Sequence, residues 1–334
     1  MGGAPNIREV AVRAGVSVGT VSNVLNRPEL VAEPTRERVY AAIAELGFVR
    51  NDSARQLRVG RSRTLGLVVL DVANPFFTDV ARGVEDTANQ NGLAVILCNT
   101  DEDPGKEASH LDLLAEMRVQ GVLINPIDTG GRIAALRDRG IPVVLFDRLG
   151  DPAVECSVAV DDVLGGRLAA AHLIEAGHRS IQFVGGPLTL RQVQERYEGA
   201  SAVVSAHDDV ELTVLTTPAL NVAAGRAAGD RLAAGGRDAL PSAVFCANDL
   251  LALGVLQALT HAGLRVPADV AIVGYDDIDF AAAAAVPLSS VRQPRQQLGR
   301  TAAELLLAET VADEHEHRQV VFEPELIVRD SSTR

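Results

Sequence analysis

The stretch AGVSVGTVSNVLN, residues 14–26, holds a serine between two glycines at the spacing of a hydrolase nucleophile. Gly15, Ser17 and Gly19 match the G-x-S-x-G pattern, in which a strand leads into a sharp turn that exposes the serine hydroxyl. The apolar residues before Gly15 instead recur at the i, i+3, i+4, i+7 spacing of an amphipathic helix; they are Ile7, Val10, Ala11 and Ala14. The sequence therefore argues against a nucleophilic role for Ser17.

The same stretch fits two short helices joined by a tight turn. Gly15 can take the left-handed conformation that ends a helix, and Ser17 can accept from the free amides of a second helix as its N-cap. A third helical stripe opens at EPTRE, with Pro34 in its first turn. Two such helices braced by a third can place the second one in a DNA major groove. An ordinary helical bundle has the same spacing.

Charge distinguishes the N-terminal segment from the rest of the chain. The 334-residue chain has a formal net charge of -13, which by itself argues against a nucleic-acid partner. Residues 1–63, however, contain ten arginines and six acidic residues, so the remainder carries a net charge of -17. Only the N-terminal segment suits a phosphate backbone.

Length and hydropathy predict several domains and a cytoplasmic protein. The chain is 47% hydrophobic, enough for two or more sizeable cores. No apolar run approaches the ~20 residues that cross a bilayer, and the N-terminus lacks the apolar core of a signal peptide.

The cysteines and histidines do not predict a metal site. Cys98, Cys156 and Cys246 are widely spaced, and each lies in or beside a strand-like apolar segment, so we expect buried free thiols. The tract DEHEH around His315 and His317 resembles a metal-binding sequence but has no second cluster. We expect a solvated acidic turn there, and no cofactor or metal.

From Thr64 onward, short apolar runs alternate with helical stripes of roughly 15 residues, a pattern that predicts parallel sheets covered by helices on both faces. The runs are LGLVVLD, AVILCNT, GVLIN, PVVLFD, SVAVDD, IQFVGG, AVFCAND and AIVGYDD. Most end in a polar residue, and ligands of open parallel sheets bind beyond the carboxyl ends of the strands. Lys106 is the only lysine of the chain, so these carboxylates, amides and few arginines suit a neutral polyol better than a phosphate.

The chain resembles transcription regulators of the lactose repressor/galactose repressor family over essentially its whole length. The N-terminal part of the resemblance consists of IREVAVRAGVSVGTVSNVLN, TRERVYAAIAELGF and NDSARQLRVGRSRTLGLVV. The later motifs, in order, are NPFF, FDR, AGHRSIQFVGGP, ERYEG, FCANDLLALGVLQAL, VPADVAIVGYDD and PLSSVRQP. The combination is specific, although each fragment alone is weak.

The resemblance implies an all-α helix-turn-helix domain followed by an α/β core of two doubly wound parallel-sheet lobes, similar to a periplasmic binding protein. The implied parts are the helix-turn-helix at 1–50, a hinge at 51–63, one lobe from 64–161 with 292–321, and the other from 162–291 with 322–334. The protein would bind a near-palindromic operator as a homodimer, and a sugar-like effector between the lobes would control its DNA affinity.

The resemblance also implies which residues contact DNA. Val18 could meet a thymine methyl, Asn23 could pair with adenine or a phosphate, and Leu57 stands where the family carries a wedge for the minor groove. The implied DNA contacts are Ser17, Val18, Gly19, Thr20, Ser22, Asn23, Asn26, Arg55, Leu57 and Arg58.

A second set of residues is implied for the effector, with a pentose such as ribose as the closest match. Phe77 and Asn125 are the members of this set that we expect to be structural, and Leu220 replaces an aromatic residue of many sugar binders. The implied effector contacts are Asn74, Phe76, Phe77, Asn125, Asp147, Arg148, Arg196, Asn248, Asp276 and Gln293.

Alternatives to a sugar-controlled repressor stay open. A corepressor metabolite or a protein partner could control the core in place of a sugar. An apolar or filled cleft would favour the protein partner. A sugar-metabolising enzyme is the remote alternative, because no phosphate-binding loop, zinc-type histidine spacing or nucleophile stands in a suitable context.

Leu57→Ala tests the wedge. If Leu57 enters the minor groove, the substitution should weaken binding to operator DNA far more than binding to random DNA, because only the kinked site uses the wedge. Fluorescence anisotropy with both duplexes measures this. Equal losses on the two duplexes would give Leu57 a merely structural role.

Overall fold

A computed structural model describes residues 5–48, 62–127, 131–311 and 315–333. The chain divides into two compact units, Met1–Ser62 and Arg63–Arg334. The implied hinge contacts Arg55, Leu57 and Arg58 lie outside the described residues.

The first unit is a small bundle of helices, as predicted. Asn6 caps its first helix through a capping box with Glu9, and Gly15 ends that helix with a φ of 66°. Over residues 5–48 the elements are α1 (Ile7–Ala14), α2 (Val18–Asn26), the 3-10 turn η1 (Pro28–Leu30) and α3 (Glu33–Leu46). Their apolar faces form one core of Val10, Ala11, Ala14, Val21, Val24, Val39 and Ala42.

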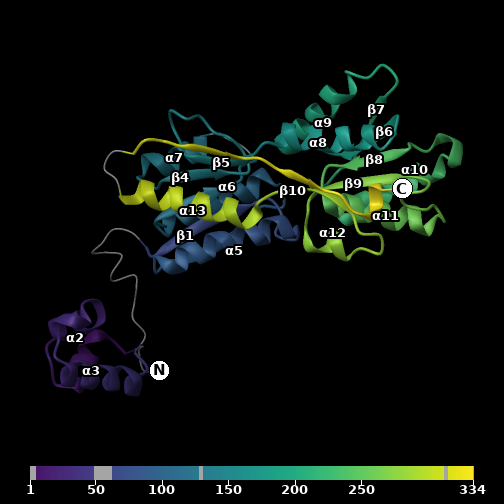
Figure 1. Ribbon diagram of the computed structural model, residues 1–334. Helices are drawn as coiled ribbons and strands as arrows, with labels where there is room; N and C mark the ends of the chain where they lie inside the picture. Colours follow the sequence, from purple (N-terminus) through teal and green to yellow (C-terminus); the bar gives the residue numbers. More distant parts are fainter. Residues whose placement is uncertain (1–4, 49–61, 128–130, 312–314, 334) are drawn as a thin grey trace. The chain divides into compact units, whose positions relative to one another are not determined.

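The second unit is built on two sheets, each with six strands among the described residues (Figure 1). The first sheet has the order β11-β5-β4-β3-β1-β2 and the second β12-β10-β9-β8-β6-β7. Their neighbouring strands pair in parallel except β12, which is antiparallel to β10.

The strands of the first sheet are β1 (Thr64–Val69), β2 (Ala94–Asn99), β3 (Gly121–Ile124), β4 (Val143–Phe146), β5 (Ser157–Val160) and β11 (Gln319–Phe322). Those of the second sheet are β6 (Ser180–Gly185), β7 (Glu211–Thr216), β8 (Ala243–Cys246), β9 (Ala271–Asp276), β10 (Ser289–Arg292) and β12 (Glu325–Ile327).

Helices cover both faces of each sheet, so the strands are buried on two sides. Leu65 and Leu67 of β1 pack with α5 and α13, whereas Val68 points to the opposite face and packs with α6 and α7. The helices of this lobe are α5 (Pro75–Gln90), α6 (Pro104–Glu116), α7 (Gly131–Asp138) and α13 (Arg295–Val311). In the second lobe α8 pairs with α9 and α10 with α11. Its helices are α8 (Asp162–Glu175), α9 (Arg191–Val204), α10 (Val222–Ala234), α11 (Asp249–His261) and α12 (Asp279–Ala283), with the 3-10 turns η2 (Arg237–Ala239) and η3 (Asp330–Ser332).

The chain passes between the lobes three times within its described part, after β5, after β10 and after β11. The predicted fold class, a helix-turn-helix with two parallel-sheet lobes, is confirmed. All eight apolar runs are strands, but β7, β10, β11 and β12 were not among them. In β10, SSVR, the buried Ser290 hydroxyl donates to Asp249, 41 positions away, so its local sequence carries little strand signal.

The three cysteines are buried and free, as predicted. The prediction of a solvated turn at His315 and His317 is wrong, because both side chains are half-buried and both face the sulfur of Cys156. That sulfur lies 159 positions before His315, so the neighbouring sequence could not reveal the contact.

Reciprocal glycines bring helix pairs into close contact. A Cβ on Gly199 of α9 would lie 2.0 Å from the carbonyl oxygen of Val163 on α8, and one on Gly166 of α8 would lie 2.0 Å from that of Arg196 on α9. Gly83 and Gly299 make the same kind of contact between α5 and α13. The α8–α9 contact fixes the position of Arg196, a residue of the cleft between the lobes.

Gly199→Ala should destabilise the second unit by about 1 to 3 kcal/mol, because the helices must separate to admit a methyl group. Thermal and urea unfolding measure the loss. The matched control is Gly131→Ala at the exposed start of α7, where an added Cβ meets nothing within 4 Å. Equal stability of the two variants would contradict the close-packing account.

Candidate functional site

Ser17 is held as a helix cap and not as a nucleophile. Its Oγ accepts a hydrogen bond from the backbone N–H of Thr20 at 3.0 Å and lies 2.9 Å from the Thr20 hydroxyl. These contacts cap the N-terminus of α2, as predicted.

The solvent face of α2 contains most of the implied base contacts. Val18, Gly19, Asn23 and Asn26 are exposed, and Val18 keeps 41% of its surface accessible. Thr20 and Ser22 are half-buried. Asn26 donates to the carbonyl oxygen of Ser22 at 2.7 Å, so its amide is already engaged within the helix. Val18 and Asn23 are therefore the implied contacts whose side chains α2 best presents to solvent.

A cleft between the lobes of the second unit gathers most of the implied effector residues. About 480 Å³ of space not filled by atoms lies among its lining residues, and this volume includes open solvent. Seven of the ten implied contacts line it: Asn74, Phe76, Phe77, Asp147, Arg196, Asn248 and Asp276. The lining also includes Leu70, Asp71, Glu102, Leu190, Gln192 and Leu220.

Two buried carboxylates face this cleft from opposite lobes. Asp147 follows β4 of the first sheet, and Asp276 ends β9 of the second. Their φ angles are 58° and 103°, in the left-handed region that costs a non-glycine residue about 1 to 3 kcal/mol. Such strain persists where surrounding contacts hold it.

Arg196 of α9 is the buried cation of the cleft. Its Nε donates to Asp162 at 2.8 Å, one terminal nitrogen donates to the carbonyl oxygen of Ala247 at 2.7 Å, and its guanidinium lies 3.7 Å from the centre of the Tyr275 ring. The same nitrogen lies 3.9 Å from a carboxylate oxygen of Asp276. Burial works against its charge, but Asp162 and the other nearby groups outweigh it and raise the pKa of Arg196.

Burial raises the pKa of both cleft carboxyl groups. It raises the pKa of Asp147 to about 8, with repulsion from Asp162 adding to the effect. Burial also raises the pKa of Asp276, to about 6, against the opposing influence of Arg196 and Gln293. Asp147 can therefore act near neutral pH as a hydrogen-bond donor as well as an acceptor.

Three implied contacts do not line the cleft. Asn125 donates to Asp147 Oδ2 at 2.9 Å, and Gln293 donates to Asp276 Oδ1 at 2.7 Å. Arg148 turns toward the carbonyl oxygen of Pro126, at 3.4 Å. Asn125 and Gln293 thus orient the two carboxylates from behind.

Gln192, which the sequence did not single out, links the lobes. It belongs to α9 of the second lobe, and its amide donates to Asp147 Oδ2 at 2.8 Å. Arg295 makes a further link, because its Nε donates to Asp79 of α5 at 2.9 Å while its terminal nitrogen donates to the carbonyl oxygen of Asp277 at 2.6 Å. Gln192 lies five residues after the motif AGHRSIQFVGGP. Only the register of α9, which places it one turn before Arg196, could have indicated it.

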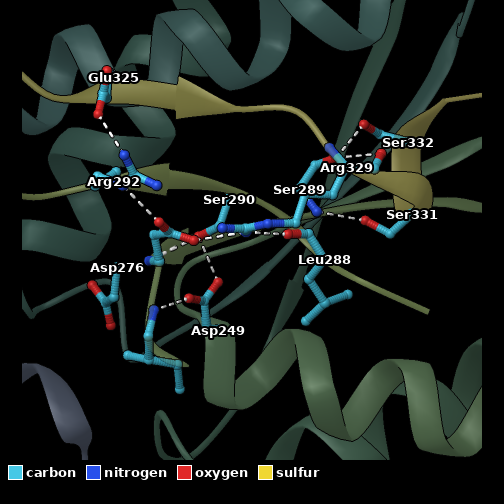
Figure 2. Close-up of polar contacts among 12 residues, drawn as sticks. Asp249, Asp276, Leu288, Ser289, Ser290, Arg292, Glu325, Arg329, Ser331 and Ser332 are labelled. Carbon is cyan, nitrogen blue, oxygen red and sulfur yellow. Dashed lines mark hydrogen bonds and ion pairs between the residues drawn. The ribbon is translucent and has the colours of Figure 1, made fainter. Parts of the chain in front are cut away.

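A buried network fixes the loop that carries Asp276 (Figure 2). Asp249, at the start of α11, accepts from the hydroxyl of Ser290 at 2.7 Å and from the backbone N–H of Ile278 at 2.9 Å. Asp277 forms ion pairs with Arg292 at 2.7 Å and Arg329 at 2.6 Å. These contacts hold both sides of Asp276 and leave its own side chain directed at the cleft.

One cleft oxygen lacks a partner. Within the described part of the chain, Asp147 Oδ1 is buried and has no hydrogen-bond partner, an arrangement that costs free energy until a ligand or water satisfies it. Phe76 and Phe77 pack edge to face, with ring centres 5.0 Å apart, and offer an apolar wall. The cleft can thus bind a small molecule that has hydroxyl or N–H groups and an apolar face.

The described helices include none long and apolar enough to cross a membrane.

Comparisons with known proteins agree for both units. The family described as bacterial regulatory proteins, lacI family, matches residues 6–51, and a periplasmic binding protein-like domain matches residues 170–332. The HTH-type transcriptional repressor PurR of Aliivibrio fischeri is 35% identical over 331 residues, 97% of each chain. PurR of Haemophilus influenzae is 37% identical over 335 residues, 97% of this chain and 98% of the relative.

Solved structures show the same likeness. The lac repressor dimer bound to operator and the anti-inducer ONPF is 27% identical, with a TM-score of 0.86 over 99% of this chain and 100% of that one. A LacI family regulator from Enterococcus faecalis with bound ribose is 30% identical, with a TM-score of 0.74 over 81% of this chain and 98% of that one.

Asp147→Asn tests the electrostatics of the cleft. Because folding raises the pKa of Asp147 from 3.8 to about 8, the protonated acid stabilises the fold at low pH, and that stability is lost as pH rises through about 8. The melting temperature of Asp147→Asn, relative to wild type, should therefore increase between pH 5 and pH 9. The exposed control Asp208→Asn should follow the wild type. Parallel curves for Asp147→Asn and wild type would contradict the shift.

Proposed function

The chain belongs to the lacI family of bacterial regulatory proteins and is a ligand-controlled, DNA-binding transcriptional repressor; we propose that its ligand is a neutral polyol, a pentose such as ribose. The relatives are repressors and not enzymes. Members of this family bind operator DNA as dimers.

The observation that carries the proposal is the pair of carboxylates on opposite lobes. Asp147 Oδ1 has no hydrogen-bond partner among the described residues. A carboxyl group with a pKa of about 8 can both donate and accept a hydrogen bond near neutral pH. A sugar hydroxyl also both donates and accepts, so one hydroxyl can satisfy this group in either protonation state. Asp276 and Asn248 offer further acceptors and donors from the other lobe.

The charge of the cleft favours a ligand without a negative charge. Among the described lining residues, Asp71, Glu102, Asp147 and Asp276 are acidic and Arg196 is the one base. Arg196 already forms an ion pair with Asp162. A phosphate would face several carboxylates without a free cation, which costs several kcal/mol for a buried charge.

A purine base acting as corepressor is the second candidate effector. The relatives named PurR favour it. The apolar walls of the cleft, Phe76 and Phe77 on one lobe and Leu190 and Leu220 on the other, suit a planar ring. Ring N–H groups could donate to Asp147 or Asp276. A protein partner gains no support, because Asp147 and Asp276 line the cleft and are not turned away from it.

Ligand control would act through the arrangement of the lobes. A ligand held by Asp147 and Asp276 together stabilises one arrangement by its differential affinity. The implied hinge, residues 51–63, precedes β1 of the first lobe, so a changed lobe arrangement can alter how two hinges meet on DNA. We propose that Leu57 enters the minor groove and that Val18 and Asn23 read bases. Coupling of about 1 to 3 kcal/mol would change operator affinity roughly 5- to 150-fold.

A thermal-shift screen of the full-length protein tests the proposal. The panel contains ribose, cellobiose, ribose 5-phosphate, adenine, guanine and hypoxanthine. A ligand at 100 times its dissociation constant stabilises the fold by about 2.7 kcal/mol. A shift with ribose supports the polyol, a shift with a base alone supports the purine, and a shift with the phosphate alone contradicts both.

Asp276→Asn should remove the response to the ligand that the screen identifies and leave operator binding within about twofold of wild type. Asparagine tolerates the left-handed backbone at this position, so the loop stays intact while the charged acceptor is lost. Asp279→Asn, an exposed change three residues later, is the matched control and should respond fully. Operator binding by anisotropy, with and without ligand, measures both variants. A fully responsive Asp276→Asn protein would exclude Asp276 from the site.

A further inference from the structure

A second cluster of chemically capable side chains lies outside the cleft. Cys156, Glu309, His315 and His317 each offer one ligand atom, and these four atoms all lie within 4.8 Å of one another. We propose that they form a binding site for a divalent transition-metal ion of the zinc type. The proposal is independent of the effector and of DNA binding.

The distances are close to those of a tetrahedral site. The sulfur of Cys156 lies 3.0 Å from Nε2 of His315 and 4.0 Å from Nδ1 of His317. Zinc bonds of ~2.3 Å to sulfur and ~2.0 Å to nitrogen, set at tetrahedral angles, place sulfur and nitrogen about 3.5 Å apart. The two observed sulfur–nitrogen separations bracket that value, so shifts of about half an ångström would bring both imidazoles to tetrahedral separation from the sulfur.

The donor set matches a transition metal and not magnesium or calcium. One thiolate, two imidazoles and one carboxylate are all ligands that zinc accepts, whereas magnesium and calcium take oxygen ligands. The thiolate and carboxylate carry two negative charges, which a divalent ion neutralises. Metal binding would replace the proton of the Cys156 thiol, and that proton would leave to solvent.

Two contacts of the cluster support a ligand role. Oε2 of Glu309 is buried and, among the described residues, has no hydrogen-bond partner. The backbone N–H of Arg318 points at the Cys156 sulfur at 3.3 Å, which would stabilise a thiolate. Arg137 is the cation that faces Glu309, but its guanidinium is already paired with Glu155.

The four residues come from three segments that meet at one end of the first lobe. Cys156 precedes β5, the two histidines precede β11, and Glu309 lies in the last turn of α13, away from the second lobe (Figure 1). Ser157 and Gln319 are paired at the start of these parallel strands. The cleft lies at the carboxyl ends of the strands, whereas the metal site lies at their amino ends. A bound ion would tie α13 and the segment entering β11 to the start of β5.

Cobalt titration of the full-length protein, freed of any histidine tag and treated with a chelator, tests the proposal. We expect one equivalent of Co²⁺ per chain, a thiolate-to-cobalt charge-transfer band, and displacement of the cobalt by Zn²⁺. Zn²⁺ should also raise the melting temperature. Absence of a thiolate band, or of a stoichiometric site, would overturn the proposal.

Matched variants identify the ligands. Cys156→Ser and His317→Ala should each weaken Co²⁺ binding by at least about 100-fold, because the loss of an outer-shell partner alone can cost that much. Cys98→Ala and His207→Ala remove the same residue types elsewhere and should bind as wild type does. Unchanged binding by Cys156→Ser and His317→Ala would mean that the metal sits elsewhere, against the proposal.

A double variant keeps the test decisive if Cys156→Ser does not fold. Cys98→Ala/Cys246→Ala leaves Cys156 as the chain's only thiol. The charge-transfer band should persist in this protein at full intensity. Its loss from a folded double variant, as judged by circular dichroism, would assign the thiolate to another cysteine and overturn the site.

Discussion

The buried charge of Arg196 is the constraint on which the cleft depends. A guanidinium that is only 4% exposed must be paired, because an isolated buried ion costs several kcal/mol. Asp162 on α8, the carbonyl oxygen of Ala247 after β8 and the ring of Tyr275 on β9 meet this need from three elements. The close α8–α9 contact at Gly166 and Gly199 brings Asp162 within reach. One side chain thus joins the helix layer to the strand ends, and its charge opposes the effect of burial on the pKa of both cleft carboxyl groups.

The division of polar groups between two lobes makes the cleft suited to control. Asp147 belongs to one lobe and Asp276 to the other, and Gln192 already bridges the gap to Asp147. A ligand that bonds both carboxylates gains contacts only when the lobes are in one arrangement, and that difference is the free energy available for regulation. Asn125 fixes Asp147 within the first lobe, and the Asp249 network fixes the loop of Asp276 within the second. Ligand binding at the carboxylates should therefore move the lobes and not merely rearrange the two side chains.

Much of this arrangement could be predicted where the signal is local. Apolar runs gave eight strands, and the polar residues at their ends, Asp147 and Asp276 among them, pointed to the cleft. The family resemblance added Arg196 and Asn74. Gln293 was implied as a ligand contact, but its amide donates to Asp276 from behind; Asn125, which was expected to be structural, donates to Asp147 in the same way. The contact of Cys156 with His315 was missed because 159 positions separate the partners and only the pairing of β5 with β11 brings them together.

The most direct test of control through the cleft is the reciprocity of the two binding equilibria. Calorimetry would give the affinity of the cleft ligand for the free protein and for the protein saturated with operator DNA. The account predicts that these affinities differ by the same factor by which the saturating ligand changes operator affinity, roughly 5- to 150-fold. Equal ligand affinities in the presence and absence of operator would contradict it, because a ligand without differential affinity cannot shift the equilibrium.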